Sequence, residues 1–275
     1  MISIVITTKN EEKNIERILS SINRFFDMKK TEVIVVDNYS NDNTKDVSMK
    51  FCVKFALKGP ERSAQRNHGI RISIFDYILI LDADMEVTSK VQNELYDLIN
   101  LNYDFVYINE KIIQSGIIGK IRNYERSLYD NTDNNCPRFF KKKIFFNEGF
   151  FLENLTGLED TEYNLRLKNK KYKSTIMKSK INHYEIGLSF LDTIKKKVYY
   201  ILSSKEFFEK NIQSQQFNLF FRLFGIYFYK NNLKKTMKKP FIFILTFIYK
   251  NAQVLLIALI ILNQKFSKKF FKSNY

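Results

Sequence analysis

The sequence predicts an α/β domain with a mainly parallel sheet, followed by a helical region of different composition. As far as about residue 182, short apolar, β-branched runs alternate with segments whose apolar residues recur at helical spacing. Beyond that point, phenylalanine and lysine dominate and the alternation stops. We therefore expect one α/β domain in residues 1–190 and a helical region in residues 191–275.

The first predicted strands lie close to the N-terminus. Residues 2–7 form a buried strand, and apolar residues at helical spacing predict a helix after it, with Asn10 and two glutamates placed to cap its start. Residues 32–38 form a second strand, which leads through a turn into a short helix ending near residue 51. Residues 52–58 form a third, more exposed strand.

The segment "YILILDAD" at residues 77–84 is suited to a central position in the sheet, because it is almost continuously apolar. A helix and a strand at residues 104–112 follow it. In parallel βα units the strand ends "VVDN" and "LDAD" lie on the same carboxyl edge. Open α/β sheets bind their ligands at that edge.

Charge is distributed unevenly along the chain. The net charge is +16, and residues 191–275 hold 16 basic and 3 acidic side chains, which leaves 29 and 26 in residues 1–190. The positive surplus therefore belongs to the C-terminal region, where it favours an anionic partner. The two cysteines, Cys52 and Cys136, have no metal-ligand spacing, and the N-terminus shows no secretory signal, so we expect the first domain in the cytoplasm.

Two aspartates, Asp82 and Asp84, end the central strand. A carboxylate pair there can bind a divalent cation and a ribose hydroxyl, and Mg²⁺ or Mn²⁺ with a nucleoside diphosphate suits these oxygen ligands. The alternative is a solvated turn after a strand. A turn would splay the two side chains, which in a continuous strand face one side.

Other polar residues cluster at predicted strand ends and helix starts. Asp37 could bind a base or a ribose, or could form an Asx turn. Thr7 and Glu11 could line the site or cap the first helix. Arg62 and Arg66 bracket a predicted loop before a helix, where they could clamp a diphosphate or be solvated.

A second acidic group, Glu159, Asp160 and Glu162, precedes a helical pattern. These acids could stabilise a helix N-terminus, or one of them could act as a general base toward an attacking hydroxyl. His183 is one of two histidines. A lone histidine is often structural, but as a neutral imidazole His183 would suit Mn²⁺ together with Asp84.

Five segments in this order resemble the motifs of family 2 glycosyltransferases with a GT-A fold, over about residues 2–183. They read "SIVITTKNEEKNIERIL", "EVIVVDNYSNDNT", "ERSAQRNHG", "LILDADM" and "GLEDTEYNLRL". The resemblance implies a GT-A, Rossmann-like mixed sheet flanked by helices, and a nucleotide-sugar donor carrying UDP or GDP. In that family Thr7, Glu11 and Asp37 would contact the nucleoside, Arg66 the diphosphate and Asp82 the ribose.

The resemblance also implies a metal site and a catalytic base. Asp84 would be the main ligand of Mn²⁺ or Mg²⁺, and Asp160 would be the base, with Glu159 holding the acceptor or orienting that base. The family's inverting mechanism is a single displacement at the anomeric carbon. The QxxRW signature of processive members is missing from the sequence, which favours transfer of one sugar. Sugar recognition would depend on loops at residues 114–126 and 138–151.

The C-terminal region predicts a membrane anchor. Five phenylalanines from Phe217 to Phe228 are spaced as a stripe on one helix face, and residues 241–262 are almost wholly apolar. Thr246, Lys250 and Gln253 share one face of that helix, where they could pack against a neighbouring helix or a second copy of the chain.

The helix could span the bilayer or lie in its interface. In either case it would anchor the first domain at the cytoplasmic face of the cell membrane. In the interfacial case the stripe of phenylalanines would lie beside the helix, and lysines at 234, 235, 238, 239, 268, 269 and 272 would contact anionic headgroups. The acceptor would then be lipid-linked, such as a polyprenyl phosphate. Three alternatives remain: a soluble helical hairpin, a non-catalytic nucleotide-sugar-binding or membrane-scaffolding relative, and nucleic-acid binding. We expect no nucleic-acid partner, because the aromatic residues form apolar stripes.

Overall fold

The structure is a computed structural model that describes residues 1–130, 132, 137–168, 170–204, 207, 218–229 and 231–263. It divides into two compact units. The sheet unit comprises Met1–Lys111 and Asp130–Tyr184, and the helical unit comprises Ile112–Tyr129 and Glu185–Tyr275. The domain boundary at residue 190 stays a prediction.

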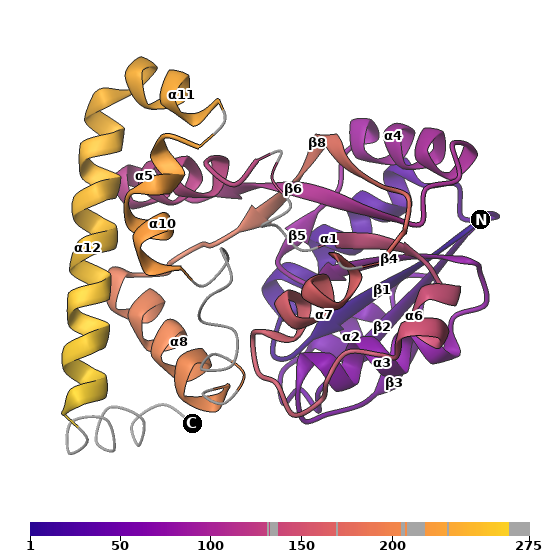
Figure 1. Cartoon of the computed structure of the whole chain (residues 1–275). Helices are drawn as coiled ribbons and strands as arrows, with labels where there is room; N and C mark the ends of the chain where they lie inside the picture. Colours follow the sequence, from indigo (N-terminus) through magenta and orange to yellow (C-terminus); the bar gives the residue numbers. More distant parts are fainter. Residues whose placement is uncertain are drawn as a thin grey trace. The chain divides into compact units, whose positions relative to one another are not determined.

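The strands form one mixed sheet in the described part of the chain, in the order β3-β2-β1-β4-β7-β6-β8-β5 (Figure 1). Strands β1, β2, β3 and β4 pair in parallel, whereas β7 pairs antiparallel with both β4 and β6. The strands are β1 Ile2–Thr8, β2 Thr31–Asp37, β3 Lys54–Leu57, β4 Tyr77–Asp82, β5 Met85–Glu86, β6 Phe105–Ile113, β7 Pro137–Lys141 and β8 Ser174–Tyr184.

Helices cover both faces of this sheet. In β1, Ile2, Ile4 and Ile6 belong to the core under α1 and α4, whereas Val5 belongs to the core under α3, α6 and α7. This alternation follows from the two-residue period of a strand. The helices of the sheet unit are α1 Glu12–Phe25, α2 Thr44–Ser48, α3 Arg62–Ile72, α4 Ser89–Asn100, α6 Lys143–Glu148 and α7 Glu159–Lys168.

The predicted α/β architecture is confirmed, and so is the central position of the strand before Asp82. Two local predictions are wrong. Asn10 does not cap the first helix, since it has a left-handed φ of 54° and the N-cap is Glu11, which makes no side-chain cap bond. Arg62 and Arg66 do not bracket a loop, because α3 already begins at Arg62.

Close packing of α3 on the sheet fixes where its polar side chains lie. At Gly69 an added Cβ would come within 2.4 Å of Val5 Cγ1, so only glycine allows the helix this close to β1. One turn earlier, Gln65 Nε2 donates to the carbonyl oxygens of Thr8 (2.8 Å) and Val36 (2.6 Å). The N-terminal turn of α3 is thus fixed beside the carboxyl ends of β1 and β2.

The helical unit is built around its longest helix, α12 Pro240–Leu262, which runs along the other helices of that unit (Figure 1). These are α5 Gly116–Ser127, α8 Phe190–Ser203, α10 Leu219–Leu223 and α11 Asn232–Lys238, with a 3₁₀ turn at Gly225–Tyr227. The predicted helix at residues 241–262 is confirmed. Two segments predicted as loops are not loops: residues 114–126 form most of α5, and residues 138–151 include most of β7 and all of α6.

The predicted phenylalanine stripe is not on one helix. Phe220 and Phe221 lie on α10, which ends at Leu223, and Phe224 and Phe228 flank the 3₁₀ turn. Phe217 and the lysines at 268, 269 and 272 lie outside the described residues. The five-residue α10 is too short to present a stripe, so the exposed phenylalanines come from consecutive short elements.

Candidate active site

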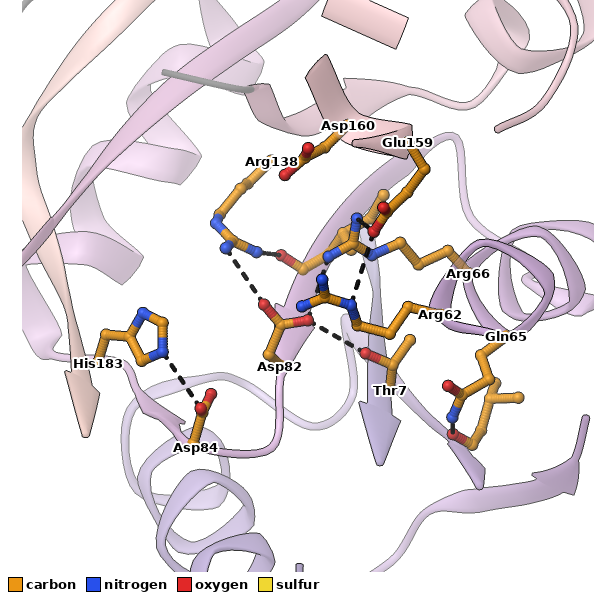
Figure 2. Close-up of polar contacts among 12 residues, drawn as sticks. Thr7, Arg62, Gln65, Arg66, Asp82, Asp84, Arg138, Glu159, Asp160 and His183 are labelled. Atoms are coloured by element: carbon orange, nitrogen blue, oxygen red, sulfur yellow. Dashed lines mark hydrogen bonds and ion pairs between the residues drawn. The ribbon is translucent and has the colours of Figure 1, made fainter. Parts of the chain in front are cut away.

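Asp82 is the centre of a polar cluster at the carboxyl edge of β1 and β4. Its carboxylate accepts from Thr7 Oγ1 at 3.1 Å and pairs with Arg66 Nη2 and Arg138 Nη2, each at 3.2 Å (Figure 2). Burial alone would raise the pKa of Asp82, but the guanidinium groups of Arg138 and Arg66 outweigh burial and hold that pKa well below its usual range. Asp82 is therefore a fixed anion between two cations.

Glu159 is bound to the arginines of α3. Its Oε1 lies 3.1 Å from Arg66 Nη1 and 3.6 Å from Arg62 Nε, and its side chain is 1% exposed. Burial raises its pKa, although Arg66 opposes that shift. Arg66 thus links the strand end at Asp82 to the first turn of α7, while Arg62 is the more exposed of the two arginines.

Asp84 and His183 form a second group beside this cluster. The strand ends at Asp82, and the turn after it directs Asp84 toward β8, where His183 Nε2 lies 3.2 Å from Asp84 Oδ2 (Figure 2). His183 Nδ1 lies 2.9 Å from Glu110 Oε2. Burial lowers the pKa of His183, but the contacts with Asp84 and Glu110 outweigh burial and raise it to about 10.

Asp160 lies in the first turn of α7, next to Glu159. Its Oδ1 accepts from the backbone N–H of Thr161 at 2.7 Å, and Figure 2 shows its carboxylate directed toward Arg138. Burial lowers the pKa of Arg138, but the charges of Glu110, Asp82 and Asp160 outweigh burial and raise it. Glu162 lies one turn further on and pairs with Arg166 at 2.6 Å, so it is engaged elsewhere.

The remaining predicted donor residues lie at the ends of β1 and β2. Burial, together with the charges of Asp84 and other carboxylates, raises the pKa of Glu11, although its hydrogen bond from Asn14 opposes this. Asp37 is 2% exposed, and its carboxylate accepts from the backbone N–H of Ser40, three residues further on, at 2.8 Å. This local contact spans one residue more than the Asx turn expected as the alternative. A ligand contact from Asp37 stays a prediction.

The structure therefore brings most of the predicted site residues together. Contacts join Thr7, Arg66, Asp82 and Glu159 in one cluster and Asp84 with His183 in another. The sequence reasoning missed Arg138 and Glu110, which connect the two clusters: Arg138 Nη2 lies 2.8 Å from Glu110 Oε1. Three polar residues, Asn109, Glu110 and Lys111, interrupt the apolar strand β6, and this was the available signal for Glu110.

The Asp84 and His183 pair fits a divalent cation in part. Asp84 Oδ1 is buried and has no hydrogen-bond partner among the described residues, so one carboxylate oxygen beside the imidazole is available as a ligand. A carboxylate oxygen and an imidazole nitrogen suit Mn²⁺. Since no group of three or more metal-binding side chains occurs in the described part of the chain, other ligands would have to come from a bound donor or from water.

The sequence places the chain in a known family. Residues 3–155 match the family described as Glycosyl transferase family 2. The chain belongs to this family. The resemblance seen in its sequence is thereby confirmed at the level of the family.

Individual relatives agree with this assignment. An uncharacterised glycosyltransferase of Rickettsia typhi is 30% identical over 52% of this chain and 47% of its own length. A dolichol-phosphate mannosyltransferase of Pyrococcus furiosus is 25% identical over 45% of this chain and 36% of its own length. The chain thus spans about half the length, or less, of these curated relatives.

A solved structure confirms the fold. The mannosyltransferase PcManGT from Pyrobaculum calidifontis, solved with GDP-Man and Mn²⁺, superposes with a TM-score of 0.60 at 15% identity and covers 94% of this chain and 75% of its own. The GT-A type of mixed sheet predicted from the motifs is thereby confirmed. At this identity the likeness concerns the fold alone.

Proposed function

We propose that this glycosyltransferase transfers one sugar, with inversion and with the help of a divalent cation, from a nucleoside diphosphate sugar to a lipid-linked acceptor. The observation that carries the proposal is the arrangement at the sheet edge. The anion Asp82 lies between two arginines, with the Asp84 and His183 pair beside it and Asp160 near Arg138. The arginines can bind a diphosphate, the Asp84 and His183 pair can bind a cation, and Asp160 can accept the proton of an attacking hydroxyl.

In this proposal the donor binds at the carboxyl ends of β1, β2 and β4. Thr7, Glu11 and Asp37 contact the nucleoside, and Asp82 contacts the ribose. The diphosphate, carrying UDP or GDP, binds near Arg66. Arg66 already pairs with Asp82 and Glu159, and this fixes its guanidinium group before the donor arrives.

Asp84 and His183 would hold Mn²⁺ or Mg²⁺, which would offset the charge that develops on the departing nucleoside diphosphate. Asp160 would take the proton of the acceptor hydroxyl as that oxygen attacks the anomeric carbon. Glu159 is less suited than Asp160 to take this proton, because Arg66 and Arg62 bind its carboxylate. We assign to Glu159 the positioning of Arg66 and of the base.

The helical unit favours an acceptor that is held in a membrane. Polar side chains lie on the buried face of α12 and apolar side chains on its exposed face, which is the reverse of a surface helix in a soluble protein. Its buried face carries Thr246, Lys250 and Gln253, as the sequence analysis anticipated. Lys250 Nζ lies 3.7 Å from Glu125 of α5, and Gln253 Nε2 donates to Thr193 of α8 at 2.7 Å. The exposed face is apolar; it contains Phe241, Ile244, Ile248, Leu255, Leu259 and Leu262.

An apolar outer face over a polar inner face is expected of a helix that contacts lipid. Among the described residues α12 alone is long and apolar enough to cross a membrane. However, it packs against the helical unit from its first turns, at Ile242 and Phe243, to its last, at Ile260 and Ile261. A spanning α12 would draw the exposed Lys120 of α5 and Lys196 of α8 into the hydrocarbon.

We therefore propose that α12 lies in the plane of the interface, at the cytoplasmic face, with its apolar face toward the acyl chains. Exposed lysines of α11, at 234 and 238, would contact anionic headgroups. This geometry favours an acceptor carried on a lipid, such as a polyprenyl phosphate. The dolichol-phosphate mannosyltransferase relative agrees with that acceptor class.

Flotation with liposomes tests this anchor in the full-length protein. The double substitution Ile248→Lys with Leu255→Lys should abolish binding to vesicles of anionic lipid. The two side chains, which are 58% and 61% exposed respectively, lie on the apolar face of α12. The matched control is Ile74→Lys, which replaces an equally exposed isoleucine of the sheet unit. Vesicle binding that survives the double substitution, or is lost in the control, would refute this membrane face.

A non-catalytic, donor-binding relative is the alternative. It would bind a nucleotide sugar with Mn²⁺ but would release no nucleoside diphosphate, with or without a lipid acceptor. The presence of Asp160 and of the complete Asp82 cluster favours the catalytic reading.

A further inference from the structure

Glu110 is a buried carboxylate for which the sequence motifs give no role. It lies on β6, and the sheet order places β6 between β7, which carries Arg138, and β8, which carries His183. Its side chain is 3% exposed. Its Oε1 accepts from Arg138 Nε at 2.9 Å, and its Oε2 lies 2.9 Å from His183 Nδ1.

We infer that Glu110 is a positioning residue that orients the His183 imidazole so that Nε2 faces the cation held with Asp84. This inference rests on the proposed metal site. When Nε2 binds a cation, the ring retains one proton, on Nδ1, and that N–H points at Glu110 Oε2. Nε2 is then left with a lone pair on the side of Asp84, 3.2 Å from Oδ2.

Arg138 completes the arrangement by holding Glu110 in place. It binds Glu110 through Nε and Nη2, and Nη2 also lies 3.2 Å from Asp82 Oδ2. A continuous chain of alternating charges therefore runs from the donor side at Asp82 to the cation side at His183. A carboxylate that binds a guanidinium on one oxygen can only accept on the other, so the proton between Glu110 and His183 belongs to the imidazole.

The substitution Glu110→Gln separates this role from a purely structural one. If the glutamine oxygen keeps its bonds from Arg138, its NH₂ group faces His183 Nδ1 and favours the tautomer whose proton is on Nε2. That proton would lie where the cation should bind. If the amide is reversed, its NH₂ group meets the donors of Arg138 instead. The reversed orientation keeps an acceptor for Nδ1–H but sets donor against donor at Arg138, so the first orientation is favoured. In that orientation the imidazole loses its support for binding through Nε2.

The test uses Mn²⁺ alone with the full-length protein and requires no turnover. Electron paramagnetic resonance should show Mn²⁺ binding, and electron spin-echo modulation should show a histidine ¹⁴N coupling that disappears in His183→Ala. In Glu110→Gln we expect Mn²⁺ affinity to fall by about 10-fold or more, with loss of the ¹⁴N coupling. The matched control is Glu86→Gln.

Glu86 is a suitable control because it bonds the two neighbours of His183 in β8. It accepts from Asn182 Nδ2 at 2.9 Å and from Tyr184 Oη at 2.8 Å. The control should keep the ¹⁴N coupling. If Glu110→Gln keeps both affinity and coupling, the inference is overturned while the metal site stands. If the unchanged protein shows no ¹⁴N coupling, the metal assignment fails and the inference fails with it.

A second measurement needs no change at Glu110. With ¹⁵N-labelled histidine and Zn²⁺ as a diamagnetic probe, the ring nitrogens of His183 can be distinguished by nuclear magnetic resonance, since His68 is the one other histidine and His68→Gln assigns it. We expect a protonated Nδ1 and a metal-bound Nε2. Metal on Nδ1, or a proton on Nε2 in the bound state, would overturn the inference.

Discussion

The substitution Asp160→Asn tests the assignment of the general base with little change to the fold. The carboxylate of Asp160 accepts from the N–H of Thr161 at 2.7 Å, and an asparagine oxygen can accept the same bond. Asp82 is held by Thr7, Arg66 and Arg138, and none of these contacts requires the Asp160 carboxylate. Donor and metal binding should therefore stay nearly intact. What the variant loses is the ability to take a proton.

Loss of a general base costs about 10²-fold or more in rate, which corresponds to about 2.7 kcal/mol in activation free energy at 1.36 kcal/mol per tenfold. Transfer is followed by release of nucleoside diphosphate with acceptor-containing membranes, and donor binding by calorimetry with Mn²⁺. We expect the rate to fall at least 100-fold at unchanged donor affinity.

Two neighbouring acids serve as comparisons. Glu159→Gln should slow transfer less and should weaken donor binding, because Glu159 holds Arg66 at 3.1 Å. Glu162→Gln should have the smallest effect, since Glu162 pairs with Arg166. The reasoning is refuted if Asp160→Asn remains active while Glu159→Gln or Glu162→Gln loses transfer with the donor still bound.

Three further predictions concern the cation, the pH dependence of stability and the helical unit. Asp84→Asn should abolish metal-dependent transfer and weaken donor binding with Mn²⁺, and unchanged turnover would exclude Asp84 as a ligand. Asp104 accepts from Lys141 Nζ and from the backbone N–H of Lys173, each at 2.9 Å. Burial raises the pKa of Asp104, but these contacts outweigh burial and lower that pKa. Asp104→Asn should therefore reduce the melting temperature near pH 7. Because the pKa of Asp104 is lower in the folded than in the unfolded protein, its stabilisation is present above the unfolded value of about 3.9 and should vanish as the pH falls through the folded pKa. A difference in melting temperature between Asp104→Asn and the unchanged protein that persists below both pKa values would contradict this. Glu125→Gln removes the carboxylate that binds Arg122 at 2.8 Å, so it should destabilise the helical unit by about 3 kcal/mol, and unaltered resistance to proteolysis at α5 and α12 would argue against it.

The sequence predicted the parallel half of the fold well, because its signals are local. Buried β-branched runs identify β1, β2 and β4, and parallel pairing brings their carboxyl ends to one edge. Thr7 and Asp82 could therefore be expected in one place from the sequence alone. Helix periodicity likewise identified α1 and α4, and the long apolar run at residues 241–262 identified α12.

The antiparallel half could not be read in the same way. Strand β7 is five residues long and pairs with β4 and β6, so its position depends on contacts distant in sequence. Arg138 enters the site only through that pairing, and Glu110 only through the order of β7, β6 and β8. The mistaken loop between Arg62 and Arg66 has a different cause, since the start of α3 is fixed by tertiary contacts of Gln65 and Gly69 and not by a capping side chain.

The most direct test of the proposed function is a donor screen with the full-length protein in membranes. UDP- and GDP-sugars are offered one at a time with Mn²⁺, Mg²⁺ or a chelator, and release of the nucleoside diphosphate is measured for the unchanged protein and for Asp84→Asn. We predict that one class of donor is consumed with a divalent cation, that the chelator stops the reaction, and that Asp84→Asn is inactive. Equal turnover with the chelator, or turnover unaffected by Asp84→Asn, would contradict a metal-dependent transfer at this site.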